Sequence, residues 1–153
     1  MSFQTRSVDN TVSSQWADPD NAFTANDLCT STSGDGNQNV YNIIGTPFTL
    51  PGGATITGIE VKVIRGGDVD DYYSIELQDK TPVWQLKNGT ALLAVCAAGV
   101  QETLGGPSDD WAGLWDAAHI NSSSFQIRLT FNKSAKANTE TVDHIEVSRI
   151  WKL

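Results

Sequence analysis

Strict alternation of apolar and polar side chains is the feature that most limits how this chain can fold. In the segment FQIRLTFNK (125–133), the apolar row is Phe125, Ile127, Leu129 and Phe131, and polar residues fill the positions between them. A period of two places successive side chains on opposite faces of an extended strand. The pattern therefore predicts a strand with one buried face.

The same alternation recurs in TGIEVKVIR (57–65), SIELQD (74–79) and DHIEVSRIWKL (143–153). These segments complete a predicted core made of Ile59, Val61, Val63, Ile75, Leu77, Ile145 and Val147 together with the four residues above. In the last segment Arg149 interrupts the apolar row and Ile150 is out of phase, which predicts a bulge or an end buried on both faces. PFTL (47–50) is predicted as a further short strand.

Turn-forming residues separate these segments, at 51–55, 65–71, 87–90 and 104–110. Asn88-Gly89 is a dipeptide typical of hairpins. Helix signals are few, and residues 90–99 fit either a short helix or a buried strand. The sequence therefore predicts an all-β protein, an antiparallel, jelly-roll-like β-sandwich with little helix, formed by residues 16–153 as a single domain. The topology of residues 81–104 is left open.

Residues 1–15 are polar and weakly periodic, with Met1, Phe3 and Val12 among the few apolar side chains and Arg6 as the cation. Such a segment buries too little surface to order itself, so we predict a mobile N-terminal arm. Docking to a partner would use Phe3 in an apolar pocket, Arg6 against a carboxylate, and Val12. The alternative is an ordinary edge strand of the same sandwich.

The formal net charge of −8 disfavours nucleic acid and anionic membrane surfaces as partners. The first residues lack the apolar core of a signal peptide, and no apolar run approaches the roughly 18 residues of a membrane span. We therefore expect synthesis in the cytoplasm. In that reducing compartment we favour two free thiols at Cys29 and Cys96 over a disulfide, with Cys96 as a small core residue.

The segment GGPSDDWAGLWDAAHIN (105–121) is the richest in candidate site residues. Asp109 and Asp110 could form a glycosidase-like carboxylate pair, but we favour one of them, Asp109 or Asp110, capping a turn. Trp111 and Trp115, spaced i and i+4, would lie on one side of a helical turn. Exposed, they would form a sugar platform; we favour burial as a plug at one end of the sandwich.

No pattern indicates catalysis, a cofactor or a metal. The two histidines, His119 and His144, are not at metal-ligand spacing with the cysteines, and no nucleophile motif is present; His144 is expected at the surface or hydrogen-bonded. The acidic stretches 17–21 and 67–71 could bind calcium but lack the EF-hand pattern. Turn capping, above all by Asp18 before Pro19, is the preferred interpretation.

Four segments, in order, resemble a family of bacteriophage-encoded β-sandwich virion proteins, which occur as small capsid decoration, head fibre or tail-associated domains. The matching positions are Trp16, Pro19 and Ala22; Pro51, Ala54, Ile56, Gly58 and Ile59; Gly105, Gly106, Asp109 and Trp111; and Val142, Asp143, Ile145 and Val147. The resemblance implies a structural or adhesive role without catalytic residues.

Two hypotheses follow for function. The first is a non-catalytic phage structural protein, a capsid decoration (cement) protein on the outer surface of the virion. It would bind the major capsid protein or other virion subunits as a homo-oligomer, preferably a trimer. The alternative is a carbohydrate-binding adhesin or a tail, receptor-binding module that uses exposed aromatic residues such as Trp84, Tyr72 and Tyr73. A glycan-binding screen separates the two.

Overall fold

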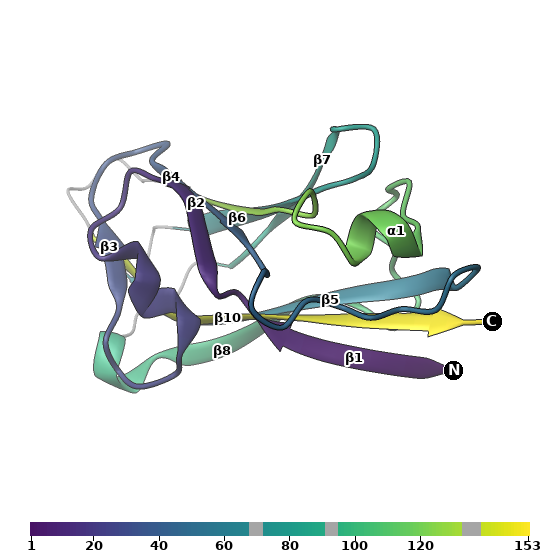
Figure 1. The fold of residues 1–153 in the computed structure, drawn as a ribbon. Coiled ribbons are helices and arrows are strands. Elements are labelled where there is room, and N and C mark those ends of the chain that lie inside the picture. The colour runs from purple at the N-terminus through teal and green to yellow at the C-terminus, as the bar shows by residue number, and fades with distance from the viewer. Residues whose placement is uncertain (68–71, 91–94, 133–138) are drawn as a thin grey trace.

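The computed structural model describes residues 1–67, 72–90, 95–132 and 139–153, and there the chain forms two β-sheets packed face to face (Figure 1). Sheet A has the order β1 (Ser2–Ser7), β10 (Glu140–Lys152), β5 (Thr55–Gly66), β8 (Val100–Gly106), and β3 (Thr30–Thr32) pairs with the start of β10. Sheet B has the order β2 (Asn10–Ser14), β4 (Gln38–Asn42), β9 (Ile127–Asn132), β6 (Tyr72–Gln78), β7 (Trp84–Asn88). All these pairings are antiparallel. The predicted all-β sandwich is confirmed.

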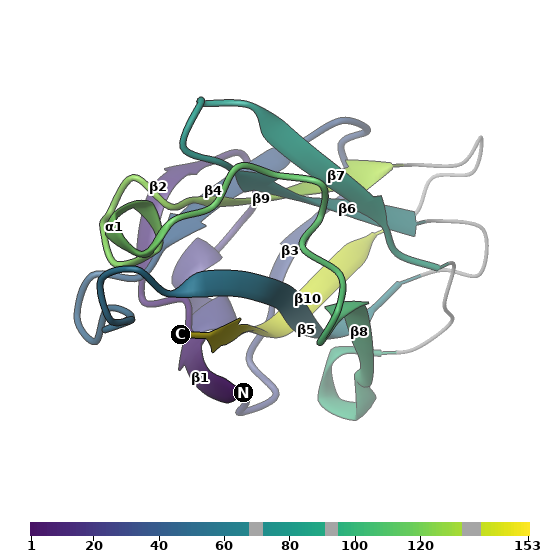
Figure 2. The same cartoon turned by 90° about the vertical axis from the view of Figure 1, so that its right-hand side faces the viewer.

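The core lies between the two sheets, which Figure 2 shows as an upper layer with β6, β7 and β9 and a lower layer with β5 and β10. Every residue predicted from the alternating segments as core is at most 1% exposed. Alternation is a reliable guide here because each of these strands has one face against the other sheet and one toward solvent.

β10 pairs with β5 along nearly its whole length, with register shifts at Val142/His144 and at Ile150/Trp151. The second shift confirms the bulge predicted from the out-of-phase Ile150. Ile150 and Trp151 are each 7% exposed, so this end of the strand is buried on both faces.

One end of the sandwich is closed by the short helix α1 (Ala117–Ile120) and by the loop that precedes β5 (Figure 1). Phe48 and Leu50 in this loop are buried, but the strand predicted at 47–50 does not form. The backbone N–H of Leu50 donates to Asn121 Oδ1 at 2.8 Å, and Asn121 Nδ2 donates to the Leu50 carbonyl at 2.9 Å. A side chain thus takes the place of a neighbouring strand.

The opposite end carries two 3₁₀ helices, η1 (Pro19–Phe23) and η2 (Cys96–Ala98), and a disulfide bond between Cys29 and Cys96. The prediction of two free thiols is therefore wrong. Cys96 is not a core residue but half-buried in η2, and its Cα lies 6.0 Å from that of Cys29. Residues 91–94, within the segment left open between helix and strand, lie outside the described residues.

The N-terminal segment is not a mobile arm but two strands, one in each sheet. β1 pairs with β10 from Ser2↔Trp151 to Ser7↔Glu146, and β2 pairs with β4. Between them, Val8 is fully buried and its N–H donates to the Ile145 carbonyl at 3.1 Å. Backbone pairing to a buried neighbour orders this polar segment, which confirms the alternative of an edge strand.

Candidate functional site

The outer face of sheet B presents a continuous row of outward side chains from three adjacent strands. Pairing places Glu76 of β6 between Arg128 of β9 and Leu86 of β7, and places Gln78 opposite Trp84. We call this surface the Trp84 face. It consists of Tyr72, Ser74, Glu76 and Gln78 from β6, Trp84, Leu86 and Asn88 from β7, and Arg128, Thr130 and Asn132 from β9.

Trp84 is held in place on this face by a charged fork. Arg128 Nε donates to Glu76 Oε2 at 2.6 Å and Nη2 donates to Oε1 at 2.7 Å, a bidentate pair. The guanidinium carbon of Arg128 lies 4.1 Å from the centroid of the Trp84 ring. Stacking on a guanidinium that is itself fixed by a carboxylate limits the rotamers open to the half-buried indole. The result is an ordered aromatic side chain at the surface.

The rest of the Trp84 face is uncharged. Glu76 and Arg128 neutralise each other, and the other outward side chains of β6, β7 and β9 are hydroxyls, amides, an indole and a leucine. Asn132 Nδ2 donates to Ser74 Oγ at 3.2 Å, while Leu86 is 56% exposed. In a chain of net charge −8, this is a surface suited to hydrogen-bonding neutral groups.

Two of the three aromatic residues predicted for adhesion lie on this face, and one does not. Trp84 and Tyr72 project outward, but Tyr73 points into the core, is fully buried and lies beneath the Arg65 guanidinium carbon at 4.3 Å. The inward orientation of Tyr73 follows from its position in β6, because successive residues of a strand face opposite sides of the sheet and Tyr72 faces outward.

The residues predicted for docking are not brought together. Phe3 and Arg6 lie on β1 in sheet A, whereas Val12 lies on β2 in sheet B. Arg6 Nη1 donates to the Thr5 carbonyl at 2.9 Å. Phe3 is 73% exposed and Val12 45% exposed. Their docking role stays a prediction.

The segment 105–121 forms a corner of the fold. Asp109 Oδ1 accepts from the Trp111 N–H at 2.9 Å and Asp110 Oδ1 from the Ala112 N–H at 3.0 Å. Turn capping is confirmed, and both aspartates cap where one was predicted to. The hydrogen bond from Lys87 lowers the pKa of Asp109, with the Trp111 N–H adding to the effect. These carboxylates are committed to holding a loop and are not placed as a catalytic pair.

Trp111 is 4% exposed and its Nε1 donates to the Ile59 carbonyl at 3.0 Å, which confirms the predicted plug. The predicted helical stacking with Trp115 is wrong, because Trp111 and Ala112 have positive φ angles of 58° and 53° and α1 begins only at Ala117. Trp115 instead packs on the ring of Phe125, with 6.0 Å between centroids.

In the described ranges, no three or more His, Cys, Asp or Glu side chains lie together as a metal site. Asp18 stands at the N-cap of η1 without a side-chain capping hydrogen bond, so its predicted capping role is wrong. Residues 68–71 of the acidic stretch 67–71 lie outside the described residues. His144 Nε2 and Ser7 Oγ are hydrogen-bonded at 2.8 Å, as expected. None of the described helices is long and apolar enough to cross a membrane.

Sequence reasoning found Trp84 but missed Glu76 and Arg128. Each occupies a polar position of an alternating segment, where a charged residue is ordinary. Only the β6–β9 register, with Glu76 opposite Arg128, turns two such residues into one pair. The available signal is the opposite sign of the two charges, which becomes informative once those strands are known to be neighbours.

No protein-family model and no curated protein sequence matches the chain. Among solved structures, it is similar to truncated AlyQ with CBM32 and alginate lyase domains (TM-score 0.54, 14% identity), covering 99% of this chain and 35% of that one. It also aligns with TmCBM61 in complex with β-1,4-galactotriose (0.46, 9%, covering 95% and 86%). A third is the enzymatically active domain of bacteriophage CBA120 tailspike protein 4 (0.45, 11%, covering 98% and 19%). At these identities the likeness concerns the fold alone: the chain is a β-sandwich.

Proposed function

We propose that this protein is a non-catalytic glycan-binding domain and that the Trp84 face holds a neutral polysaccharide chain. The observation that carries the proposal is the indole of Trp84, which stacks on the Arg128–Glu76 ion pair on a face whose other side chains are uncharged. Of the two hypotheses drawn from the sequence, this is the carbohydrate-binding alternative.

The chemistry of the face matches that of a sugar chain. A pyranose ring presents an apolar surface of C–H groups, which packs on an aromatic side chain, and a rim of hydroxyls, which need donors and acceptors. Trp84 supplies the first, and the side-chain amides of Gln78 and Asn88 supply the second. Because the indole is already ordered, binding loses little side-chain entropy there.

The same geometry favours a neutral glycan over an acidic one. The cation on the Trp84 face, Arg128, is already paired with Glu76 through two hydrogen bonds. An acidic sugar would have to compete for that guanidinium and would approach a chain of net charge −8.

The carboxylates at and near the candidate site support binding without bond cleavage. Both oxygens of Glu76 accept from Arg128, and Asp109 and Asp110 accept from turn amides. General acid–base catalysis of glycoside hydrolysis needs two carboxyl groups free to face one scissile bond.

An array of neutral hexasaccharides of glucose, galactose, mannose and xylose tests this function. We expect binding to at least one, and Trp84→Ala should weaken it about tenfold or more, because a well-packed aromatic contact contributes more than about 1.4 kcal/mol. Trp84→Phe should retain part of the affinity.

Val83→Ala serves as the matched control, since Val83 is an exposed apolar neighbour that precedes β7; it should leave binding unchanged. The proposal fails if no glycan binds, or if Trp84→Ala binds as tightly as the parent protein.

A further inference from the structure

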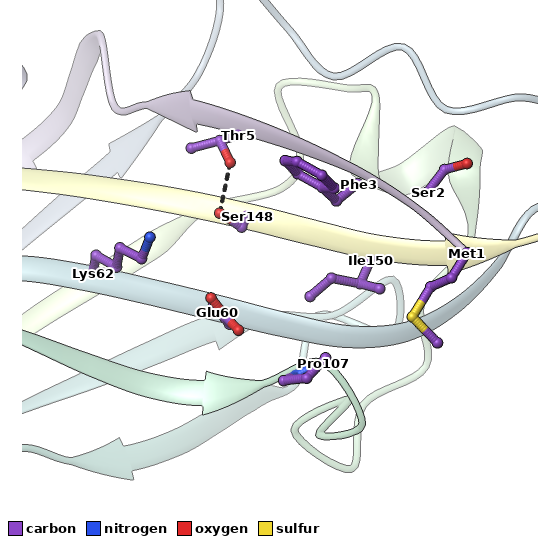
Figure 3. A pocket seen from close by; sticks show the side chains of 9 residues that line it. All are labelled: Met1, Ser2, Phe3, Thr5, Glu60, Lys62, Pro107, Ser148 and Ile150. Carbon is purple, nitrogen blue, oxygen red and sulfur yellow. Dashed lines mark hydrogen bonds between the residues drawn. The ribbon is translucent and has the colours of Figure 1, made fainter.

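A separate pocket of about 370 Å³ lies on the outer face of sheet A, on the opposite side of the sandwich from the Trp84 face. Its walls come from β1, β5, β10 and the residue after β8 (Figure 3). They are lined by Met1, Ser2, Phe3, Thr5, Glu60, Lys62, Pro107, Ser148 and Ile150. This volume lies near the lower end of the range for small-molecule sites, roughly 300–1,000 Å³.

The floor of the pocket is unusually well covered for the solvent side of a sheet. Ser148 and Ile150 point outward from β10, yet each is only 7% exposed. In Figure 3 the rings of Phe3 and Pro107 stand on either side of Ile150. The pocket therefore has an apolar floor, and the side-chain rings of Phe3 and Pro107 form two of its walls. Phe3 is 73% exposed.

One rim of the pocket is polar. Glu60 lies opposite Ser148 in β10, and no described residue hydrogen-bonds or pairs with its carboxylate. Beside it, Lys62 Nζ makes a long, 4.0 Å contact with Glu146. The hydroxyls of Thr5 and Ser148 bond each other at 2.7 Å, which leaves one hydroxyl proton free to donate.

We infer that this pocket is a second glycan site, one that takes the end unit of a sugar chain. An unpaired carboxylate can accept two hydrogen bonds from adjacent sugar hydroxyls, and the Phe3 and Pro107 rings contact the C–H face of the same unit. A purely apolar ligand would desolvate Glu60 without a partner. The inference rests on the proposed glycan-binding function and extends it: one copy of the domain holds two glycans on opposite faces.

Backbone-amide NMR titration with the methyl glycosides of glucose, galactose, mannose and N-acetylglucosamine tests the inference. At least one should shift amides of β1, β5 and β10 around the pocket and leave those of β6, β7 and β9 unmoved. Glu60→Gln should weaken this binding about tenfold or more, because a hydrogen bond to a charged group contributes roughly 1.5–3 kcal/mol. Because the Glu60 carboxylate has no partner among the described residues, the Glu60→Gln variant should have the same melting temperature as the parent protein.

Glu146→Gln is the matched control, a second glutamate on the same face of sheet A that does not line the pocket; it should bind like the parent protein. Trp84→Ala should keep the monosaccharide shifts while losing those that a hexasaccharide produces in sheet B. Glu60→Gln should do the reverse.

Two results would overturn the inference, and they are distinguishable. If monosaccharides shift no amide near the pocket, or Glu60→Gln binds normally, while hexasaccharides still shift sheet B, the second site is wrong and the proposed function stands. If no sugar of either length shifts any amide, both fail.

Discussion

Arg149 points from β10 into the core, where it is fully buried. Its guanidinium carbon lies 3.9 Å from the ring centroid of Phe125 and 5.0 Å from that of Phe48. No described residue supplies a hydrogen-bond acceptor to its guanidinium nitrogens. Burial without a carboxylate partner lowers the pKa of Arg149 well below its usual value. The two aromatic rings are the groups that accommodate the charge.

Replacing Arg149 with Met should therefore raise the free energy of unfolding by about 1–4 kcal/mol, because an apolar side chain fills the site with no charge to desolvate. Urea unfolding at neutral pH measures the change. Arg65→Met is the control: Arg65 is equally buried, but its Nη1 donates to Glu140 Oε1 at 2.6 Å. That variant should lose about 3–5 kcal/mol, because it breaks a buried ion pair and removes the cation that neutralises Glu140. Equal losses in both variants would contradict the argument.

The sequence shows Arg149 only as an interruption of an apolar row. Its burial depends on Phe48 and Phe125, which come from distant loops, and no local pattern reports those contacts. The same holds for Trp84, which the sequence identifies as a candidate aromatic but without the Arg128–Glu76 fork that fixes it.

At the scale of elements, β1 is part of sheet A and β2 is part of sheet B. Removing residues 2–12 should therefore destabilise the domain. Exposure of the partners of Val8 alone costs about 1.5–3 kcal/mol, and the β1–β10 and β2–β4 pairings are lost as well. Thermal unfolding should show a lower or absent transition. Phe3→Ser, at an exposed position of the same strand, should unfold like the parent protein. If the truncated protein unfolds at the same temperature as the parent protein, the result would support the mobile-arm hypothesis.

Strands with an apolar row could be predicted, and strands without one could not. β5, β6, β9 and β10 each bury alternate side chains, so apolar and polar residues alternate in their sequences. β1 and β2 are edge strands held largely by backbone hydrogen bonds, which leave no mark on side-chain polarity. The hairpin predicted at Asn88-Gly89 is wrong, because the strands on either side of this dipeptide, β7 and β8, lie in different sheets and do not pair.

For the whole molecule, the disulfide between Cys29 and Cys96 closes a long loop, with a sequence separation of 67. Chain-entropy arguments give about 4 kcal/mol of stabilisation for a loop of this length. Urea unfolding with and without dithiothreitol should show a loss up to this size, while the large apolar core keeps the reduced protein folded. The double variant Cys29→Ser, Cys96→Ser should be insensitive to dithiothreitol. An unchanged midpoint on reduction would count against the bond.

The resemblance to phage virion proteins stays a prediction, as do a place on the virion, the trimer and the capsid partner. A two-faced glycan-binding sandwich is compatible with an adhesive role on a particle surface, where many weak sites act together. Quantifying copies of the chain on purified particles checks the prediction directly, since a decoration protein is present in many copies and a tail module in few.

The central place of β10 in sheet A has a consequence for how the chain acquires its fold. β1 and β5 do not pair with each other; both pair with β10. During synthesis, β1 and β5 therefore wait for their shared neighbour until residues 140–152 have left the ribosome. Such non-local pairing slows folding and leaves strand edges exposed in the meantime. We expect the β1–β10 and β10–β5 pairings to form late, on a timescale of milliseconds to seconds once β10 is available.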